Sequence, residues 1–247
     1  MYLYETHLHT SQSSKCGRSA GSEYIPKYID MGYTGVFVTD HFYGGNTAID
    51  KTLPWRRFAE EFYRGYEDAR EAGGRLGLDV FFGWEEHFDG DEYLVYGPDI
   101  DWIAERPYMR RWSRASQFRE VGGAGGCVVQ AHPFRARDYI GRIRLSPKFA
   151  HGVEVANSAN FMEEDVLALG YARRYGLTAT AGSDIHEAGR RVGEDAFGVW
   201  LPERISRPRD FARLVREGRV AGLKVPSERF EGTGLERPAL PVAMNRR

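Results

Sequence analysis

The segment Glu5-Thr6-His7-Leu8-His9 follows a short apolar run near the start of the chain. On a β-strand alternate side chains share a face, so His7 and His9 project from the same side, about 7 Å apart. Two imidazoles placed in this way can reach one metal ion. The same spacing returns in Asp184-Ile185-His186, again directly after an apolar run. One such pair alone is equally consistent with structural histidines, so the prediction depends on which other residues join it.

Apolar runs of strand length alternate with helix-like segments along the whole chain. The predicted strands cover residues 2–4, 35–41, 79–87, 93–96, 127–133, 152–157, 178–184 and 196–201, and the predicted helices cover 22–31, 55–72, 112–121, 163–175 and 208–217. Strands that alternate with helices indicate a parallel sheet with right-handed crossovers. About seven such units favour an α/β fold with one closed (β/α)7 barrel, as a single domain over residues 1–223. Residues 224–247, rich in Gly, Pro and charge, are expected to form an irregular tail.

Composition excludes several classes of protein. The 247 residues carry a formal net charge of -1, which gives no general attraction to nucleic acid or to an anionic membrane. Cys16 and Cys127 do not form a C-x-x-C pair, and two cysteines do not suggest a disulfide framework. We see no signal peptide and no run near ~18 apolar residues, so we expect a cytoplasmic protein without a membrane span.

Most of the predicted strands end in histidine or acidic residues. These polar residues, together with one asparagine, are His7, His9, Asp40, His41, Glu85, His87, His132, Asn157, Asp184 and His186. The carboxyl ends of parallel strands share one rim in α/β folds, so residues distant in sequence should converge there. Any one of these histidines alone is more often structural, but the set together favours a metal centre. Imidazole and carboxylate ligands suit Zn, Mn or Fe and argue against an iron–sulfur cluster.

The same residues suggest a hydrolytic chemistry. A carboxylate such as Glu85 can bridge two ions about 3.5–4 Å apart, and such a pair activates water and binds phosphoryl oxygens. No predicted strand leads directly into a nucleophile elbow of the G-x-S-x-G type, so metal-activated water is the better hypothesis than a serine nucleophile.

Five motifs resemble those of the PHP family, named for its polymerase and histidinol phosphatase domains. They are His7-Leu8-His9-Thr10, Thr39-Asp40-His41, Gly83-Trp84-Glu85, Ala131-His132-Pro133 and Gly182-Ser183-Asp184-Ile185-His186. The resemblance implies a distorted seven-stranded β/α barrel and phosphoester hydrolysis with two or three divalent ions (Mn, Zn or Fe). It also implies three ion positions: His7, His9, Glu85 and Asp184 at the first, Glu85 and His132 at the second, and His41 and His186 at the third.

The chain departs from the family pattern at two places. The family often has a His or Asp shortly after the first motif, where this chain has Ser11-Gln12-Ser13-Ser14-Lys15-Cys16-Gly17-Arg18. Cys16 is either a substitute thiolate or a structural or merely exposed residue, and the second interpretation is favoured. The second departure follows Glu85, where Glu92-Tyr93-Leu94-Val95 replaces a stretch that often holds a His; His87 either compensates or lies at the rim. We therefore expect two tightly held ions and a weaker third.

A phosphomonoester also needs cationic groups outside the metal cluster. Arg135, directly after His132-Pro133-Phe134, is the first candidate, and Lys15, Arg18, Arg190 and Arg191 follow. Asp40 and Arg135 are the candidate catalytic residues.

The leading hypothesis is a metal-dependent phosphoesterase that acts on a small phosphorylated metabolite. A nuclease or phosphodiesterase, a non-catalytic metal-binding regulatory module, and another metal-dependent hydrolase such as an amidase remain as alternatives.

Overall fold

The computed structural model describes residues 1–138, 140–190 and 196–231. Its strands are β1 (Tyr2–Glu5), β2 (Gly35–Val38), β3 (Asp79–Phe88), β4 (Asp91–Tyr96), β5 (Cys127–Ala131), β6 (Gly152–Asn157), β7 (Thr178–Gly182), β8 (Gly198–Leu201) and β9 (Gly222–Lys224). Its α-helices are α1 (Tyr24–Asp30), α2 (Trp55–Phe62), α3 (Arg64–Leu76), α4 (Ile100–Ala104), α5 (Arg114–Gly123), α6 (Met162–Tyr175) and α7 (Pro208–Arg216). Short 3-10 helices cover Gly21–Glu23, Pro107–Arg111 and Ser227–Phe230.

The strands of the described ranges form one nine-stranded sheet in the order β7-β6-β5-β4-β3-β2-β1-β8-β9. The sheet curves so that the chain beyond β1 meets the chain beyond β7. Leu8 and Ile185 form a parallel bridge there, and the amide of His9 donates to the carbonyl of Ile185 at 2.9 Å. The expected α/β barrel is therefore confirmed as a nearly closed barrel, with nine strands where about seven units were predicted.

Four strand pairs are antiparallel, where a wholly parallel sheet was expected: β3–β4, β4–β5, β1–β8 and β8–β9. The β3–β4 pair is a hairpin with the two-residue turn Asp89-Gly90, whose φ angles are +51° and +102°. Positive φ at both central residues matches the type I′ turn that an Asp-Gly pair favours. This local turn sends β4 back along β3, because no crossover helix lies between them.

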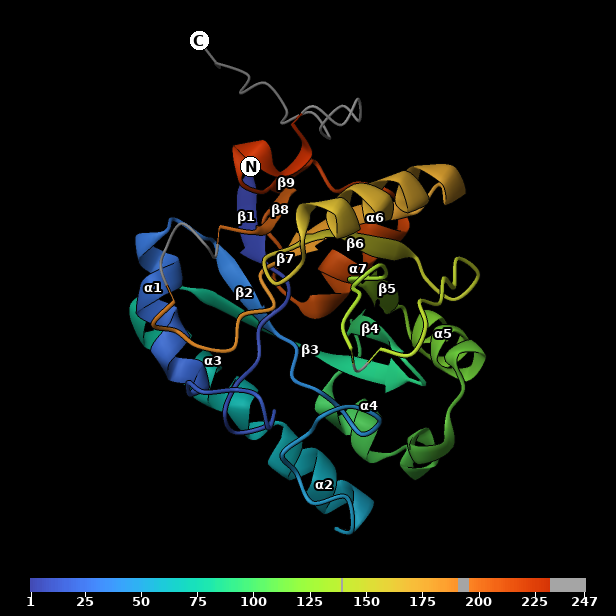
Figure 1. The fold of residues 1–247 in the computed structure, drawn as a ribbon. Helices are drawn as coiled ribbons and strands as arrows, with labels where there is room; N and C mark the ends of the chain where they lie inside the picture. Colours follow the sequence, from blue (N-terminus) through green and yellow to red (C-terminus); the bar gives the residue numbers. More distant parts are fainter. Residues whose placement is uncertain (139, 191–195, 232–247) are drawn as a thin grey trace.

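Three apolar clusters hold the sheet and its helices together. Inside the barrel, Phe211 of α7 packs on Phe37 and Tyr96, with ring centroids 4.8 Å from each. A second cluster joins α2 and α4 to β3 and β4, and a third joins α1 and α3 to β1 and β2. Figure 1 shows α1 beside α3 on one flank of the sheet and α6 along β6. These clusters leave the carboxyl ends of the strands as the polar rim of the barrel.

The structure adds detail at two predicted boundaries. The helix expected over residues 55–72 is divided at Tyr63 into α2 and α3, and α3 continues to Leu76 before Gly77 ends it with a φ of +88°. The tail expected to be irregular from residue 224 starts with the last residue of β9 and the 3-10 helix at Ser227–Phe230. Residues 232–247 lie outside the described ranges.

No helix within the described ranges has the length and apolar character needed to span a lipid bilayer.

Candidate metal centre

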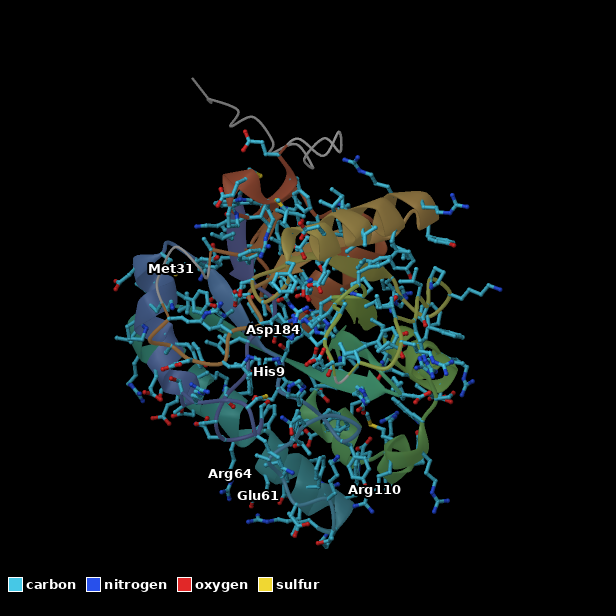
Figure 2. All side chains as sticks on the ribbon, viewed as in Figure 1. His9, Met31, Glu61, Arg64, Arg110 and Asp184 are labelled. Carbon is cyan, nitrogen blue, oxygen red and sulfur yellow. The ribbon has the colours of Figure 1, made fainter. Side chains whose placement is uncertain are left out.

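The predicted metal ligands converge at the rim formed by the carboxyl ends of the strands. They come from five segments, which lie just beyond the ends of β1, β2, β5 and β7 and within the C-terminal half of the long strand β3: His7, His9, His41, Glu85, His132, Asp184 and His186. Figure 2 shows His9 and Asp184 together near the middle of the molecule, and His9 Nε2 lies 3.1 Å from Asp184 Oδ1. The fold thus brings His7 and His9, near the start of the chain, into one cluster with Asp184 and His186.

Among the described residues, four overlapping groups of donor atoms can hold a metal ion, with all atoms of a group within 4.8 Å of one another. The groups are His7, His9 and Asp184; His7, Glu85 and His132; His41, Glu85 and Glu92; and His9, His41 and His186. His7 Nε2 is 3.0 Å from His9 Nε2 and 3.4 Å from Glu85 Oε1. Two ligands of one tetrahedral ion, each about 2.1 Å from it, lie about 3.4 Å apart, so these separations fit a bound ion.

Three of the histidines are oriented by hydrogen bonds that their Nδ1 atoms donate. Nδ1 of His7 lies 2.9 Å from Glu154 Oε1, and Nδ1 of His9 lies 3.2 Å from the Ser14 hydroxyl. Nδ1 of His186 lies 2.8 Å from the carbonyl oxygen of Asp184. An acceptor at Nδ1 places the ring proton there and leaves the Nε2 lone pair free for a metal ion.

Among the described residues, two buried atoms of the cluster lack a hydrogen-bond partner. Such atoms are expected where a metal ion would bind, so they show whether the residues fit an ion. His41 Nδ1 and Glu85 Oε2 are 2.8 Å apart without hydrogen-bond geometry, and neither atom has a hydrogen-bond partner among the described residues. The side chain of Glu85 is only 1% exposed, so its unpaired oxygen has no access to bulk water. Buried polar atoms normally find partners, and a cation between these two lone pairs would satisfy both.

Burial and neighbouring charges shift the pKa values of His7 and His9 in opposite directions. Burial opposes a charge on His7, but the surrounding carboxylates, with Glu154 the largest contributor, outweigh it and raise the pKa of His7 well above its ordinary value. Burial, with further contributions from His41 and His186, lowers the pKa of His9 well below its ordinary value. Metal ligation requires neutral imidazoles, so binding of an ion would displace the proton that the carboxylates hold on His7.

The backbone is strained at two of the candidate ligands. His132 has a φ of +27° and Asp184 a φ of +53°, in the left-handed region that residues with a side chain rarely adopt. Beside them, β7 approaches β1 closely at Gly182, where an added Cβ would lie 2.5 Å from the Cβ of His7. The ends of β5 and β7 are therefore held in conformations that direct their side chains into the cluster.

Two carboxylates of the site were not among the predicted ligands. Glu154, in the middle of β6, is fully buried and accepts hydrogen bonds from the backbone amide of His132 and from the Asn157 side chain, in addition to facing His7. Glu92 of β4 lies 3.5 Å from His132 Nε2 and 4.0 Å from His41 Nδ1. An acid between Val153 and Val155 in an apolar strand is the sequence signal for Glu154, and the Asp89-Gly90 turn is the signal for Glu92.

Asp40, predicted to be catalytic, is engaged in holding the first loop. Its carboxylate accepts hydrogen bonds from the backbone amide and hydroxyl of Thr10 and from the Ser14 hydroxyl, at 2.6, 2.7 and 2.6 Å. Burial raises its pKa to about 6, although these hydrogen bonds oppose the shift. Since Ser14 also contacts His9 Nδ1, the geometry gives Asp40 a positioning role and supplies no contact with the cavity.

Arg135, the other predicted catalytic residue, does line the cavity. Its Nη2 atom is 2.8 Å from Asp184 Oδ2 and donates to Asn157 Oδ1 at 2.8 Å, while Nε donates to Asn160 Oδ1 at 2.9 Å. Burial raises the pKa of Asp184, but His7 and Arg135 outweigh this effect and hold that pKa well below its usual range. Arg135 therefore keeps a candidate ligand ionised and places a positive charge at the cavity wall.

Three of the other predicted phosphate-binding cations, Lys15, Arg18 and Arg190, do not line the cavity. Lys15 is exposed, and Arg18, with a side chain 76% exposed, lies 3.8 Å from Glu187. Arg190 donates a hydrogen bond to a serine hydroxyl at 3.4 Å. Arg191 lies outside the described residues.

The two residues weighed as substitutes for missing ligands lie in different surroundings. Cys16 lines the cavity with His41 and His186. Burial raises the pKa of its thiol, but hydrogen bonds with His186 and His41 outweigh burial and lower the pKa to about 6. His87 belongs to none of the donor groups, and its Nε2 atom accepts a hydrogen bond from the amide of Gly90 at 3.1 Å.

Solved structures that share this barrel fold include proteins described as metal-dependent phosphoesterases. A two-domain protein from Bacteroides vulgatus that contains a predicted PHP-like metal-dependent phosphoesterase superposes with a TM-score of 0.64 at 16% identity, over 90% of this chain and 64% of that chain. A protein from Bifidobacterium adolescentis that is described as a putative metal-dependent phosphoesterase superposes with a TM-score of 0.52 at 19% identity, over 88% of this chain and 96% of that one. The chain is thus similar in fold to PHP-like metal-dependent phosphoesterases, as its motifs predicted.

One curated protein adds similarity in sequence. A 3',5'-nucleoside bisphosphate phosphatase from Chromobacterium violaceum is 39% identical over 106 residues, which cover 36% of this chain and 37% of the relative. The match therefore spans little more than a third of the relative's length. No family model matches the chain.

Proposed function

We propose that this protein is a metal-dependent phosphoesterase that hydrolyses a phosphomonoester of a small metabolite. One observation carries the proposal: donor atoms of five histidines and three carboxylates converge in overlapping groups at one rim of the barrel. Two of these buried donor atoms, His41 Nδ1 and Glu85 Oε2, have no hydrogen-bond partner within the part of the chain that the structure describes. The similarity to the Chromobacterium violaceum phosphatase and to the PHP-like structures supports phosphoester hydrolysis as the reaction.

We propose that the ions are held by the groups that the geometry defines. His7, His9 and Asp184 would hold one ion, and Glu85 would bridge to a second ion at His132. Glu92, 3.5 Å from His132 Nε2, takes the place of the histidine that the family often has on the neighbouring strand. Divalent ions such as Mn, Zn or Fe at these positions would supply Lewis-acid activation of water and neutralise charge on the phosphoryl group.

The protein's own residues bind and orient the substrate beside the ions. The guanidinium of Arg135 offers positive charge at the cavity wall, and its bonds to Asn157 and Asn160 fix its position. The cavity has a volume of about 380 Å³, within the range of roughly 300–1,000 Å³ that accommodates small ligands. A small metabolite therefore fits better than a polymer, and the net charge of -1 gives no general attraction to nucleic acid.

The test is hydrolysis of a phosphoester panel with added Mn or Zn. The panel includes a nucleoside 3',5'-bisphosphate, because the curated relative acts on this class, and mononucleotides, sugar phosphates and amino-alcohol phosphates. We expect His9→Ala and Asp184→Ala to lose at least ~100-fold in kcat/KM, because each removes a metal ligand. His87→Ala, which removes a histidine outside the donor groups, serves as the matched control and should keep its activity. Retained activity in both ligand variants would refute the proposal.

The same panel separates the alternatives. Preference for a single-stranded oligonucleotide over mononucleotides would indicate a nuclease or phosphodiesterase. Tight metal binding without turnover of any phosphoester would indicate a regulatory module. We also propose a reducing compartment such as the cytoplasm, because Cys16 and Cys127 are both free thiols.

A further inference from the structure

The 3-10 helix at Ser227–Phe230, near the end of the described chain, is anchored in the core. Phe230 is 3% exposed and belongs to the same apolar cluster as Phe211. The guanidinium of Arg229 lies over the ring of Phe197, 5.2 Å from the ring centroid. The helix also contacts α6. These contacts fix the backbone at Arg229, whose side chain is 15% exposed and extends to the loop between β6 and α6.

Arg229 binds this loop with three of its guanidinium nitrogens. Nη1 donates to the carbonyl of Asn160 at 3.0 Å, and Nη2 donates to the carbonyl of Asn157 at 2.9 Å. Nε lies 3.1 Å from Oδ2 of Asp165, a fully buried residue in the first turn of α6. Burial raises the pKa of Asp165 to about 7, and Arg229 makes the largest opposing contribution. Arg229 therefore clamps the loop to the start of α6.

The two asparagines that supply these carbonyls also hold Arg135. Oδ1 of Asn157 accepts a hydrogen bond from Arg135 Nη2 at 2.8 Å, and Oδ1 of Asn160 accepts one from Arg135 Nε at 2.9 Å. Their Nδ2 groups are also used: Asn157 donates to Glu154 at 2.9 Å, and Asn160 donates to Asp165 at 2.8 Å. Both asparagines are buried, so neither side-chain amide can turn without loss of a buried hydrogen bond.

We propose that Arg229 is a positioning residue for Arg135. Through the loop 157–160, the C-terminal segment determines where Arg135 places its positive charge at the cavity wall. The inference rests on the proposed function, in which Arg135 binds the phosphoryl group of the substrate. Misplacement of such a group by about 1 Å can lower a rate by up to ~100-fold, so a contact outside the cavity can affect turnover.

Arg229→Lys tests this role, because a lysine keeps a positive charge beside Asp165 but cannot reach the carboxylate and both carbonyls. We expect kcat/KM for a phosphomonoester of the panel to fall ~5- to 10-fold, mainly through KM, with unchanged metal content. In an Arg135→Lys background the same substitution should lower kcat/KM by less than ~2-fold, because its effect passes through Arg135. Arg204→Lys alters an exposed pair with Asp79 and serves as the control that keeps wild-type values.

A second readout requires no turnover. The Nε–H of Arg135, bonded to Asn160, should give a slowly exchanging side-chain signal in heteronuclear NMR of the full chain with diamagnetic Zn²⁺. The absence of this signal in Arg135→Lys assigns it. We expect Arg229→Lys to speed the exchange of this proton with water at least ~10-fold. Arg229→Gln combined with Asp165→Asn removes the buried ion pair as a whole and leaves no unpaired charge, and it should show the same faster exchange.

The inference is overturned if the Arg135 signal exchanges at the wild-type rate in whichever Arg229 variants are folded. It is also overturned if Arg229→Lys loses as much kcat/KM with Arg135→Lys present as without it. Unfolding of both Arg229 variants at the assay temperature would overturn it too, since Arg229 would then serve the fold alone. Faster exchange in a chain that hydrolyses no phosphoester would support the positioning role and contradict the proposed function. Turnover by the wild type, with unchanged exchange in the variants, would do the reverse.

Discussion

Replacing Glu154 by Gln should weaken metal binding although Glu154 belongs to none of the donor groups. Its carboxylate faces three donors: His7 Nδ1 at 2.9 Å, the amide of His132 at 3.2 Å and the Asn157 side chain at 2.9 Å. A glutamine has one acceptor oxygen, so its NH2 group must face at least one of these donors. If the NH2 group faces His7, it moves the imidazole proton to Nε2 and blocks the atom that binds the metal. If it faces the other side, two buried donors lose their acceptor.

Either outcome costs about 1–3 kcal/mol, the usual cost of an unsatisfied buried polar group. This corresponds to a loss of roughly 10- to 100-fold in metal affinity. Competition with a chromophoric chelator measures the affinity of the first ion. Glu164→Gln is the matched control, because Glu164 is also buried and accepts from backbone amides at residues 136 and 161, but contacts no candidate ligand. The reasoning fails if Glu154→Gln binds its first ion within ~3-fold of wild type, or if the control loses as much.

Three further predictions concern the surroundings of the site. Arg135→Lys should lower kcat/KM for a phosphomonoester by ~10- to 100-fold with unchanged metal content. The reason is that a lysine cannot contact Asn157, Asn160 and Asp184 together as the guanidinium does. An unchanged kcat/KM would count against the role of Arg135. Gly182→Ala should destabilise the fold by about 1–3 kcal/mol in urea unfolding and weaken metal binding, because the Cβ of the alanine would lie 2.5 Å from the Cβ of His7. A variant with wild-type stability and normal metal binding would contradict this close approach. Burial lowers the pKa of His151 from 6.5 to about 4, so the stability that its neutral ring provides is present above pH 6.5 and is lost as the pH falls towards 4. Allowing for the partial exposure of the ring, wild type should lose about 1–2 kcal/mol more than His151→Asn over this window in unfolding experiments, and equal losses would contradict the assignment.

The positions of the candidate ligands could be predicted because each is a local feature of the sequence. An apolar run that ends in His, Asp or Glu shows both the strand and its polar end, as at Val38-Thr39-Asp40-His41. Parallel packing then places such ends at one rim, so convergence of His7 with Asp184 follows from the fold class. The metals themselves and the roles of these residues stay predictions.

The groups that the sequence reading missed depend on contacts between strands. The role of Glu154 can be seen only once the fold places β6 near His7. In the sequence Glu154 lies between Val153 and Val155, so it was interpreted as part of a buried core strand. Glu92 reaches His132 because a two-residue turn sets the register in which it pairs with His87. A strand prediction gives no register across a hairpin unless the turn is recognised first.

Asp40 was assigned to catalysis as a polar residue at a strand end, and that assignment stays a prediction. Its oxygens are used by Thr10 and Ser14, whose positions in the first loop no periodicity could provide. Loop geometry depends on the close approach at Gly17 and on hydrogen bonds to distant segments, including that to His186. Such contacts follow from the assembled fold.

Elemental analysis of the purified protein, combined with the phosphoester panel, tests the central claim most directly. The account predicts two or more equivalents of transition metal per chain and turnover of a small phosphomonoester. Both should be lost after chelation and restored by added Mn or Zn. One equivalent or none, with no turnover under any added metal, would contradict a working metal centre at the rim of the barrel.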